Sequence, residues 1–201
     1  VDKVVERFAA VRERVGKKVD IAIDFRGRVS PAMSIRLLKA LEPYYPLFVE
    51  EPVLPENVDE MVRVSRSTTI PIAAGERLFT KFGFRELIEK QAVSVVQPDL
   101  CHCGGIFEAR KIAAMAETYY MQIAPHNPLG PISLAACMQL DACVPNLLAQ
   151  EHPGMPDHAD LGVGILKTPF KIEDGYIRIP EGPGLGIEVD ESKLDALRFS
   201  S

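Results

Sequence analysis

Six ionisable residues recur along the chain at intervals of 23 to 27 residues, each at the end of a short apolar segment. This interval is about what one strand, one helix and two short loops require. Catalytic groups of parallel α/β folds lie at the carboxyl ends of the strands, so the pattern predicts one shared active site. The six residues are Asp24, Glu50, Glu76, Asp99, His126 and Glu151.

The first three of these residues are all carboxylates. Neighbouring strand ends can converge, and an all-oxygen set suits a hard divalent ion such as Mg²⁺ that keeps positions open for substrate and water. We therefore predict that Asp24, Glu50 and Glu76 are metal ligands and that Mg²⁺ is the cofactor.

The next two residues, Asp99 and His126, end consecutive predicted strands. The carboxylate could accept a hydrogen bond from one imidazole nitrogen, fix the tautomer and raise the basicity of the other nitrogen. A metal beside such a base suits removal of a proton α to a carboxylate, since the cation stabilises the negative charge of the developing enediolate.

The elements that must position these residues read as six short apolar strands that alternate with amphipathic helices. Continuous apolar runs of this kind are typical of strands buried on both faces of a parallel sheet. A Gly- and Pro-rich loop over 152–164, a hairpin around Asp174 and Gly175 and a short terminal helix complete the pattern. The predicted strands are 19–23, 47–49, 71–74, 93–97, 121–124 and 147–150, and the clearest helices are 1–15, 31–41 and 105–119.

Length and composition limit what the chain can be. Its 201 residues are 47% hydrophobic and 25% charged, which is ordinary for one globular domain. A complete eight-stranded α/β barrel usually needs roughly 250 residues. We therefore expect an α/β barrel that is incomplete at its N-terminus, with two strands absent.

Charge and hydropathy argue against several partners. The net charge of −5, with no Lys/Arg-dense run, predicts no binding of nucleic acid or of an anionic membrane surface. No apolar run approaches the roughly 18 residues that would span a bilayer, and residues 1–14 are unlike a secretory signal. We expect a cytoplasmic protein whose four cysteines are reduced thiols.

Five sequence strings carry a resemblance to a known family. They resemble, in order and spacing, the mandelate racemase branch of the enolase superfamily, and within it the D-galactonate dehydratases. The strings are Asp24-Phe-Arg-Gly-Arg, Phe48-Val-Glu-Glu-Pro-Val, Ala74-Gly-Glu-Arg, Val96-Gln-Pro-Asp99 and Ala124-Pro-His126-Asn-Pro.

The resemblance implies a TIM-type (β/α)7β barrel, with 1–165 as its partial barrel and 166–201 packing on a capping domain absent from this chain. It also implies a homo-oligomer that dehydrates an aldonic acid to a 2-keto-3-deoxy acid. Mg²⁺ would bind at the three carboxylates, with His126 as base, Asp99 behind it and Glu151 near the substrate carboxylate. Arg26 and Asn127 are the predicted substrate-binding residues.

Arg26 departs from the family pattern, which has histidine at this position to help the hydroxyl leave. Arginine stays protonated, so it is a poor proton donor but a good anion clamp. Our hypothesis is that His126 both removes the α-proton and returns it to the leaving hydroxyl in a syn elimination. The alternative is that Arg26 binds a distal carboxylate or hydroxyl and the substrate is a different acid sugar.

Two further functions remain open: a racemase or epimerase, which would need a second base, and a non-catalytic binder of a sugar acid. Each single carboxylate also has a structural interpretation, because an acid at a strand end is usually a helix cap or a surface charge. We interpret Glu51 as a structural partner, 101–103 as a loop rather than a zinc site, and His152 and His158 as solvated.

Overall fold

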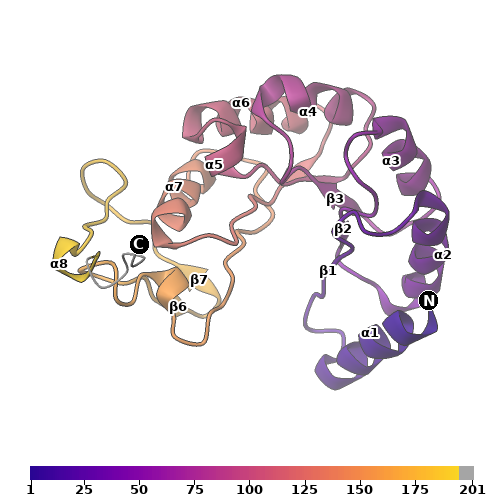
Figure 1. The fold of residues 1–201 in the computed structure, drawn as a ribbon, viewed down its shortest axis with the longest axis horizontal. Helices are drawn as coiled ribbons and strands as arrows, with labels where there is room; N and C mark the ends of the chain where they lie inside the picture. Colours follow the sequence, from indigo (N-terminus) through magenta and orange to yellow (C-terminus); the bar gives the residue numbers. More distant parts are fainter. Residues whose placement is uncertain (195–201) are drawn as a thin grey trace, which may run out of the picture.

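The fold is built on a parallel β-sheet in which each strand pairs with the next along the chain (Figure 1). The structure is a computed structural model and describes residues 1–194. A helix connects each pair of consecutive strands on the outer side, as expected for repeated βα units. The strands are β1 (Ile23–Asp24), β2 (Val49–Glu50), β3 (Ile72–Ala74), β4 (Val95–Val96) and β5 (Gln122–Ile123).

The strand register brings the predicted site residues to one edge of the sheet. Asp24 lies opposite Glu50, Glu50 opposite Ala73, and Ala74 opposite Val96. The side chains of β3 and β4 are all buried, which explains their uninterrupted apolar sequence. The ladders are shorter than predicted, but every predicted strand from 19–23 to 121–124 contains at least one residue of an observed strand.

The helices form a layer over the outer face of the sheet, and together sheet and helices make an open arch (Figure 1). Sequence signals set their starts: Ser30 accepts a hydrogen bond from the Met33 amide to cap α2, and Asn57 accepts one from Glu60 to cap α3. The helices are α1 (Asp2–Val15), α2 (Pro31–Leu41), α3 (Val58–Ser65), α4 (Thr80–Glu89), α5 (Leu100–Cys103), α6 (Ile106–Glu117) and α7 (Pro131–Asp141), with a 3-10 turn η1 (Glu42–Tyr44).

The hydrophobic core lies between this helix layer and the sheet. Leu38 and Leu41 of α2, Phe84 of α4 and Ile112 of α6 are completely buried against the strands. Burial of side chains of this size stabilises the fold by roughly 1.5–3 kcal/mol each. This core holds the strand ends at fixed positions and so positions the site.

The sixth predicted strand, 147–150, is wrong as an extended ladder. Only Leu147 bridges to Ile123, through backbone hydrogen bonds around that residue, and the Gln150 side chain donates to the Pro125 carbonyl at 3.1 Å. The segment runs beside β5 but has a partner on one side only among residues 1–194. The backbone pairing with β5 ends at Leu148, and Gln150 contacts the Pro125 carbonyl through its side chain instead.

The hairpin predicted around Asp174 and Gly175 is confirmed. Both residues have positive φ, 51° and 82°, as the favoured two-residue hairpin turn requires. The hairpin strands β6 (Ile172–Glu173) and β7 (Tyr176–Ile177) are antiparallel, and Ile177 packs with Phe170 on Leu134 and Met138 of α7.

Two short helical segments complete this region: the 3-10 turn η2 (Ala159–Leu161) and α8 (Glu191–Leu194). α8 is the predicted terminal helix, as far as the described residues extend. Packing of 166–201 on a separate capping domain stays a prediction, and 195–201 lie outside the described residues.

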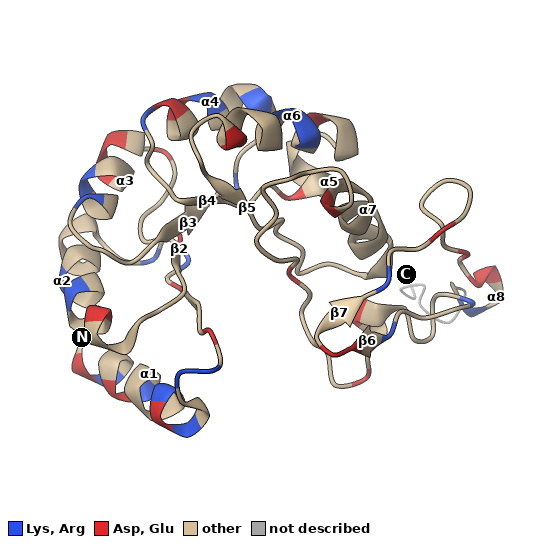
Figure 2. Cartoon of the chain, turned by 180° about the vertical axis from the view of Figure 1, so that it is seen from behind, with Lys and Arg blue, Asp and Glu red and all other residues tan. Residues whose placement is uncertain are grey.

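Acidic and basic residues are interspersed along the outer helices in Figure 2. Among residues 1–194, no helix combines the length and apolar character needed to cross a membrane.

Candidate active site

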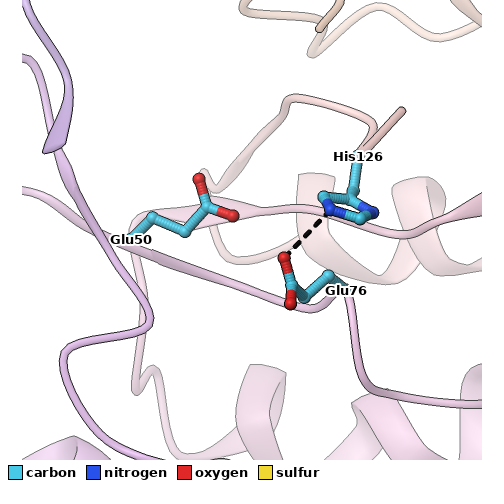
Figure 3. A group of neighbouring side chains, drawn as sticks. All are labelled: Glu50, Glu76 and His126. Atoms are coloured by element: carbon cyan, nitrogen blue, oxygen red, sulfur yellow. Dashed lines mark ion pairs between the residues drawn. The ribbon is translucent and has the colours of Figure 1, made fainter. Parts of the chain in front are cut away.

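Glu50, Glu76 and His126 point toward one another at the carboxyl edge of the sheet (Figure 3). Glu50 is the last residue of β2, and Glu76 and His126 follow β3 and β5; one ligand atom from each residue lies within 4.8 Å of the others. Within residues 1–194 this is the one group of His, Cys, Asp and Glu side chains with such spacing. The structure therefore contains a possible metal site made of two of the three predicted ligands, with His126, the predicted base, in place of Asp24.

The predicted pair of Asp99 and His126 is present in hydrogen-bonding geometry. His126 Nδ1 lies 2.9 Å from Asp99 Oδ2, and the Asp99 side chain is only 1% exposed. The second Asp99 oxygen accepts the Cys101 amide at 2.7 Å, which caps the one-turn helix α5. Asp99 is thus fixed by its own helix, and it directs Nδ1–H away from the site.

The other imidazole nitrogen faces the metal-ligand candidates. His126 Nε2 lies 2.9 Å from Glu76 Oε2 (Figure 3). With Asp99 at Nδ1, the ring therefore stands between two carboxylates. With Nδ1 turned to the buried Asp99 carboxylate, Nε2 is the nitrogen that faces the site and could exchange a proton there.

The surroundings of Glu50 suit a cation. Burial is the largest cause that raises its pKa to about 7, and the nearby carboxylates of Asp24, Glu151 and Glu76 add to the rise. A hydrogen bond from Gln97 lowers the pKa and only partly offsets these causes. A hard divalent ion would relieve the repulsion among these oxygens, so the residues present fit Mg²⁺.

Asp24 lies at the edge of this group and is engaged by Arg26. Its Oδ2 lies 2.8 Å from Arg26 Nε, and its Oδ1 accepts the Arg26 amide at 2.7 Å. The register still places it opposite Glu50. Its role as third ligand stays a prediction.

Glu151 and Asn127 are brought together by a backbone contact. The Asn127 amide donates to Glu151 Oε2 at 2.8 Å, and Asn127 is completely buried. Its side-chain Oδ1 has no hydrogen-bond partner among the described residues. Glu151 is thus held close enough to Glu50 to influence its pKa, while the substrate contacts of both residues stay predictions.

Sequence reasoning missed Arg77, which links three parts of the site. Its Nε lies 2.9 Å from Glu51 Oε2 and 3.5 Å from Glu76 Oε1, and its terminal nitrogen donates to the Arg26 carbonyl. Glu51 is 2% exposed, in agreement with its interpretation as a structural partner. The sequence signal for Arg77 was its place in the Gly75-Glu-Arg string. A Cβ at Gly75 would lie 2.8 Å from the Gln97 carbonyl oxygen, so glycine lets the two backbone segments approach each other.

Two interpretations are wrong. Residues 101–103 form the helix α5 instead of a loop, because Asp99 caps it, and His102 Nδ1 lies 3.1 Å from the Glu76 carbonyl oxygen. His152 is not simply solvated, since its Nδ1 lies 2.8 Å from the buried Asp160 carboxylate.

Comparison with known proteins agrees with this geometry. The sequence model of the enolase C-terminal domain-like family matches residues 1–193. The chain belongs to this family, whose fold is a TIM-type barrel, and the parallel sheet and helix layer described above are part of such a barrel.

Relatives and solved structures point to the same branch. The chain is 48% identical to a D-galactonate dehydratase of Variovorax paradoxus (strain S110) and 49% identical to one of Ralstonia pickettii (strain 12J), in each case over 96% of this chain. These matches cover 52% and 51% of the relatives, so the chain spans about half their length. A mandelate racemase/muconate lactonizing enzyme from Sulfitobacter sp. superposes with a TM-score of 0.91 at 43% identity, over 98% of this chain and 49% of that one.

Proposed function

We propose that the protein is a Mg²⁺-dependent sugar acid dehydratase that converts an aldonic acid to a 2-keto-3-deoxy acid. The observation that carries the proposal is the placement of His126 between buried Asp99 and the carboxylates Glu50 and Glu76. Two relatives that match 96% of the chain are named D-galactonate dehydratases, which supports this reaction class.

The proposed reaction uses His126 twice. Nε2 removes the proton from C2 of the substrate, and the electron pair of the broken C–H bond forms a C2=C3 double bond as the C3–O bond breaks. The C3 hydroxyl leaves with the proton that His126 carries, so that one water is released, and the resulting enol becomes the 2-keto acid. A syn elimination of this kind needs no second acid, in keeping with Arg26 as a permanently charged residue.

The remaining predicted residues would bind the cation and the substrate or position His126. Asp24, Glu50 and Glu76 would hold Mg²⁺, which supplies stabilisation of the negative charge on the substrate carboxylate as C2 loses its proton. Asp99 would accept a hydrogen bond from Nδ1–H and so leave Nε2 facing the substrate. Glu151, fixed by the Asn127 amide, would lie near the substrate carboxylate. A homo-oligomer and a cytoplasmic location remain expectations from the sequence.

The proposal is tested by measuring 2-keto-3-deoxy product from a panel of aldonic and aldaric acids with the complete protein and Mg²⁺. We expect product from at least one acid, and loss of the reaction in EDTA and in His126→Asn. A His126→Asn variant that eliminates at near wild-type rate would contradict the two roles of His126. Mg²⁺-dependent binding of an acid sugar without any product would instead favour a non-catalytic binder.

A further inference from the structure

We propose that Arg26 makes the site selective for acid sugars that carry a second anionic group at the end distal to the reacting carboxylate. This inference rests on the proposed function and names the substrate class of the same site. The second group is a terminal carboxylate, as in an aldaric acid, or a phosphate ester on a phosphorylated aldonic acid.

The Arg26 guanidinium is available to a ligand. Its side chain is 61% exposed, and among residues 1–194 its one polar contact is through Nε, which lies 2.8 Å from Asp24 Oδ2. Within residues 1–194, neither of its two terminal nitrogens donates a hydrogen bond. Those nitrogens form the planar fork that binds a carboxylate or phosphate through two parallel hydrogen bonds.

Hydrogen bonds hold the backbone of Arg26 at the edge of the site. Arg26 has φ of 54°, its amide donates to Asp24 Oδ1 at 2.7 Å, and its carbonyl accepts from Arg77 at 3.2 Å. Positive φ is uncommon for a residue other than glycine, and here hydrogen bonds on both sides hold it. Arg26 is therefore anchored at the site edge while its long side chain remains adjustable.

The Arg26 guanidinium is less occupied by protein carboxylates than that of Arg77. The site itself is acidic, with Glu50 and Glu76 at its centre and Asp24 at its edge. Arg77, the neighbouring arginine, contacts the carboxylates of both Glu51 and Glu76. A divalent cation held by Asp24 would offset the charge of that carboxylate and weaken its attraction for the guanidinium, which would leave Arg26 able to pair with an anion on the substrate.

A substrate whose distal end is neutral would bind the Arg26 guanidinium more weakly than one whose distal end is an anion. A hydroxyl offers a single neutral acceptor to the fork, whereas hydrogen bonds between charged partners are roughly twice as strong as neutral ones. We therefore expect the distal anion to raise kcat/KM by about 10- to 100-fold over the matched neutral substrate.

The test compares acids that share one carbon skeleton, namely galactonate, galactarate and galactonate 6-phosphate, with Mg²⁺ and the complete protein. We expect galactarate or the phosphate ester to exceed galactonate in kcat/KM by the factor above, mainly through KM. Which of the two is preferred identifies the anion. Equal kcat/KM for all three acids, or a preference for galactonate, would overturn the inference.

Variants separate charge recognition from general damage. Arg26→Gln should lower the ratio of kcat/KM for the diacid to kcat/KM for the monoacid toward one. Arg26→Lys, which keeps a point charge, should retain part of that ratio. Arg28→Gln removes another exposed arginine two residues away and should leave the ratio unchanged. An unchanged ratio in Arg26→Gln would contradict the inference.

Binding measurements keep the two proposals distinguishable. If no acid is turned over but calorimetry with Mg²⁺ still shows tighter binding of the dianion, lost in Arg26→Gln, the inference stands and the proposed dehydration fails. If galactonate is dehydrated and the dianions bind no better, the proposed function stands and the inference fails.

Discussion

The two sides of the candidate site differ in how firmly their residues are held. On the base side, Asp99 and His126 are 1% and 10% exposed, and each makes contacts at both of its polar atoms. On the open side, Asp24 is 28% exposed and Arg26 is 61% exposed, joined mainly to each other. The base side is built from two strand ends and a helix cap, whereas the open side is built from one strand end.

This difference separates two tasks. Proton transfer needs donor and acceptor fixed within hydrogen-bonding distance, which burial and paired contacts provide. Discrimination among substrates needs an accessible group that meets the distal part of the ligand, which an exposed arginine provides. We therefore expect changes on the base side to abolish chemistry and changes on the open side to redirect it.

The largest effect should come from His126→Asn. Removing the base should lower kcat by about 10²–10⁴-fold, because general acid–base catalysis contributes that much. Steady-state kinetics on the best acid of the panel measures it, with circular dichroism to check folding. The matched control is His158→Asn, an exposed histidine with positive φ that asparagine tolerates, and its kcat should not change. Retention of a tenth of the activity in His126→Asn would place the base elsewhere.

Glu76→Gln should weaken Mg²⁺ binding by about 100-fold, since it keeps the shape of a proposed ligand but removes its charge. Isothermal titration calorimetry of Mg²⁺ alone gives the affinity without relying on turnover. Glu89→Gln, an exposed glutamate of α4, is the control and should bind Mg²⁺ as the wild type does. Equal affinities in both variants would exclude Glu76 as a ligand.

The affinity for Mg²⁺ should also fall with pH. The Glu50 pKa is raised to about 7, chiefly by burial, so below pH 7 a proton must leave before the cation binds. We expect the affinity to drop by up to about tenfold per pH unit from 7 down to 5.5 and to be flat near pH 8. The raised pKa also means that the cation-free protein loses stability as pH rises from 4.5 through about 7. Calorimetry that finds one affinity between pH 5.5 and 8 would contradict this.

The smallest effect should come from Asp141, a half-buried acid outside both sides of the site. Burial raises the pKa of Asp141 to about 7, and its Oδ1 has no hydrogen-bond partner in the described part of the chain. Its contribution to stability is full below pH 3.8 and is lost as pH rises through about 7. Asp141→Asn should therefore raise Tm by a few degrees at pH 8, leave Tm nearly unchanged at pH 4 and leave kcat unaffected. A lower Tm at pH 8 would show that the ionised carboxylate has a partner in solution.

The sequence predicted the repeating elements well because the buried strands and helix caps are local signals. The helix over 31–41 has those limits in the structure, and the turn at Asp174 and Gly175 is in place. It also predicted that Asp99 and His126 meet, since consecutive parallel strand ends are neighbours.

Contacts that depend on side-chain reach could not be predicted in this way. Arg77 spans from Glu51 to the Arg26 carbonyl, and His152 turns to Asp160, and neither contact has a periodic signature in the sequence. The pairing of Arg26 with Asp24 is likewise a choice of side-chain conformation at one strand end. Such choices set which residues of the open side are free for a ligand.

The most direct test of the central claim is proton NMR of acid sugars in D₂O with the complete protein and Mg²⁺. If His126 beside the carboxylate site removes the proton α to a carboxylate, the C2 proton signal of the substrate disappears as a C3 methylene signal appears. The same sample with His126→Asn should keep its C2 proton. An acid that binds with Mg²⁺-dependent affinity but keeps its C2 proton in the wild-type protein would contradict the account.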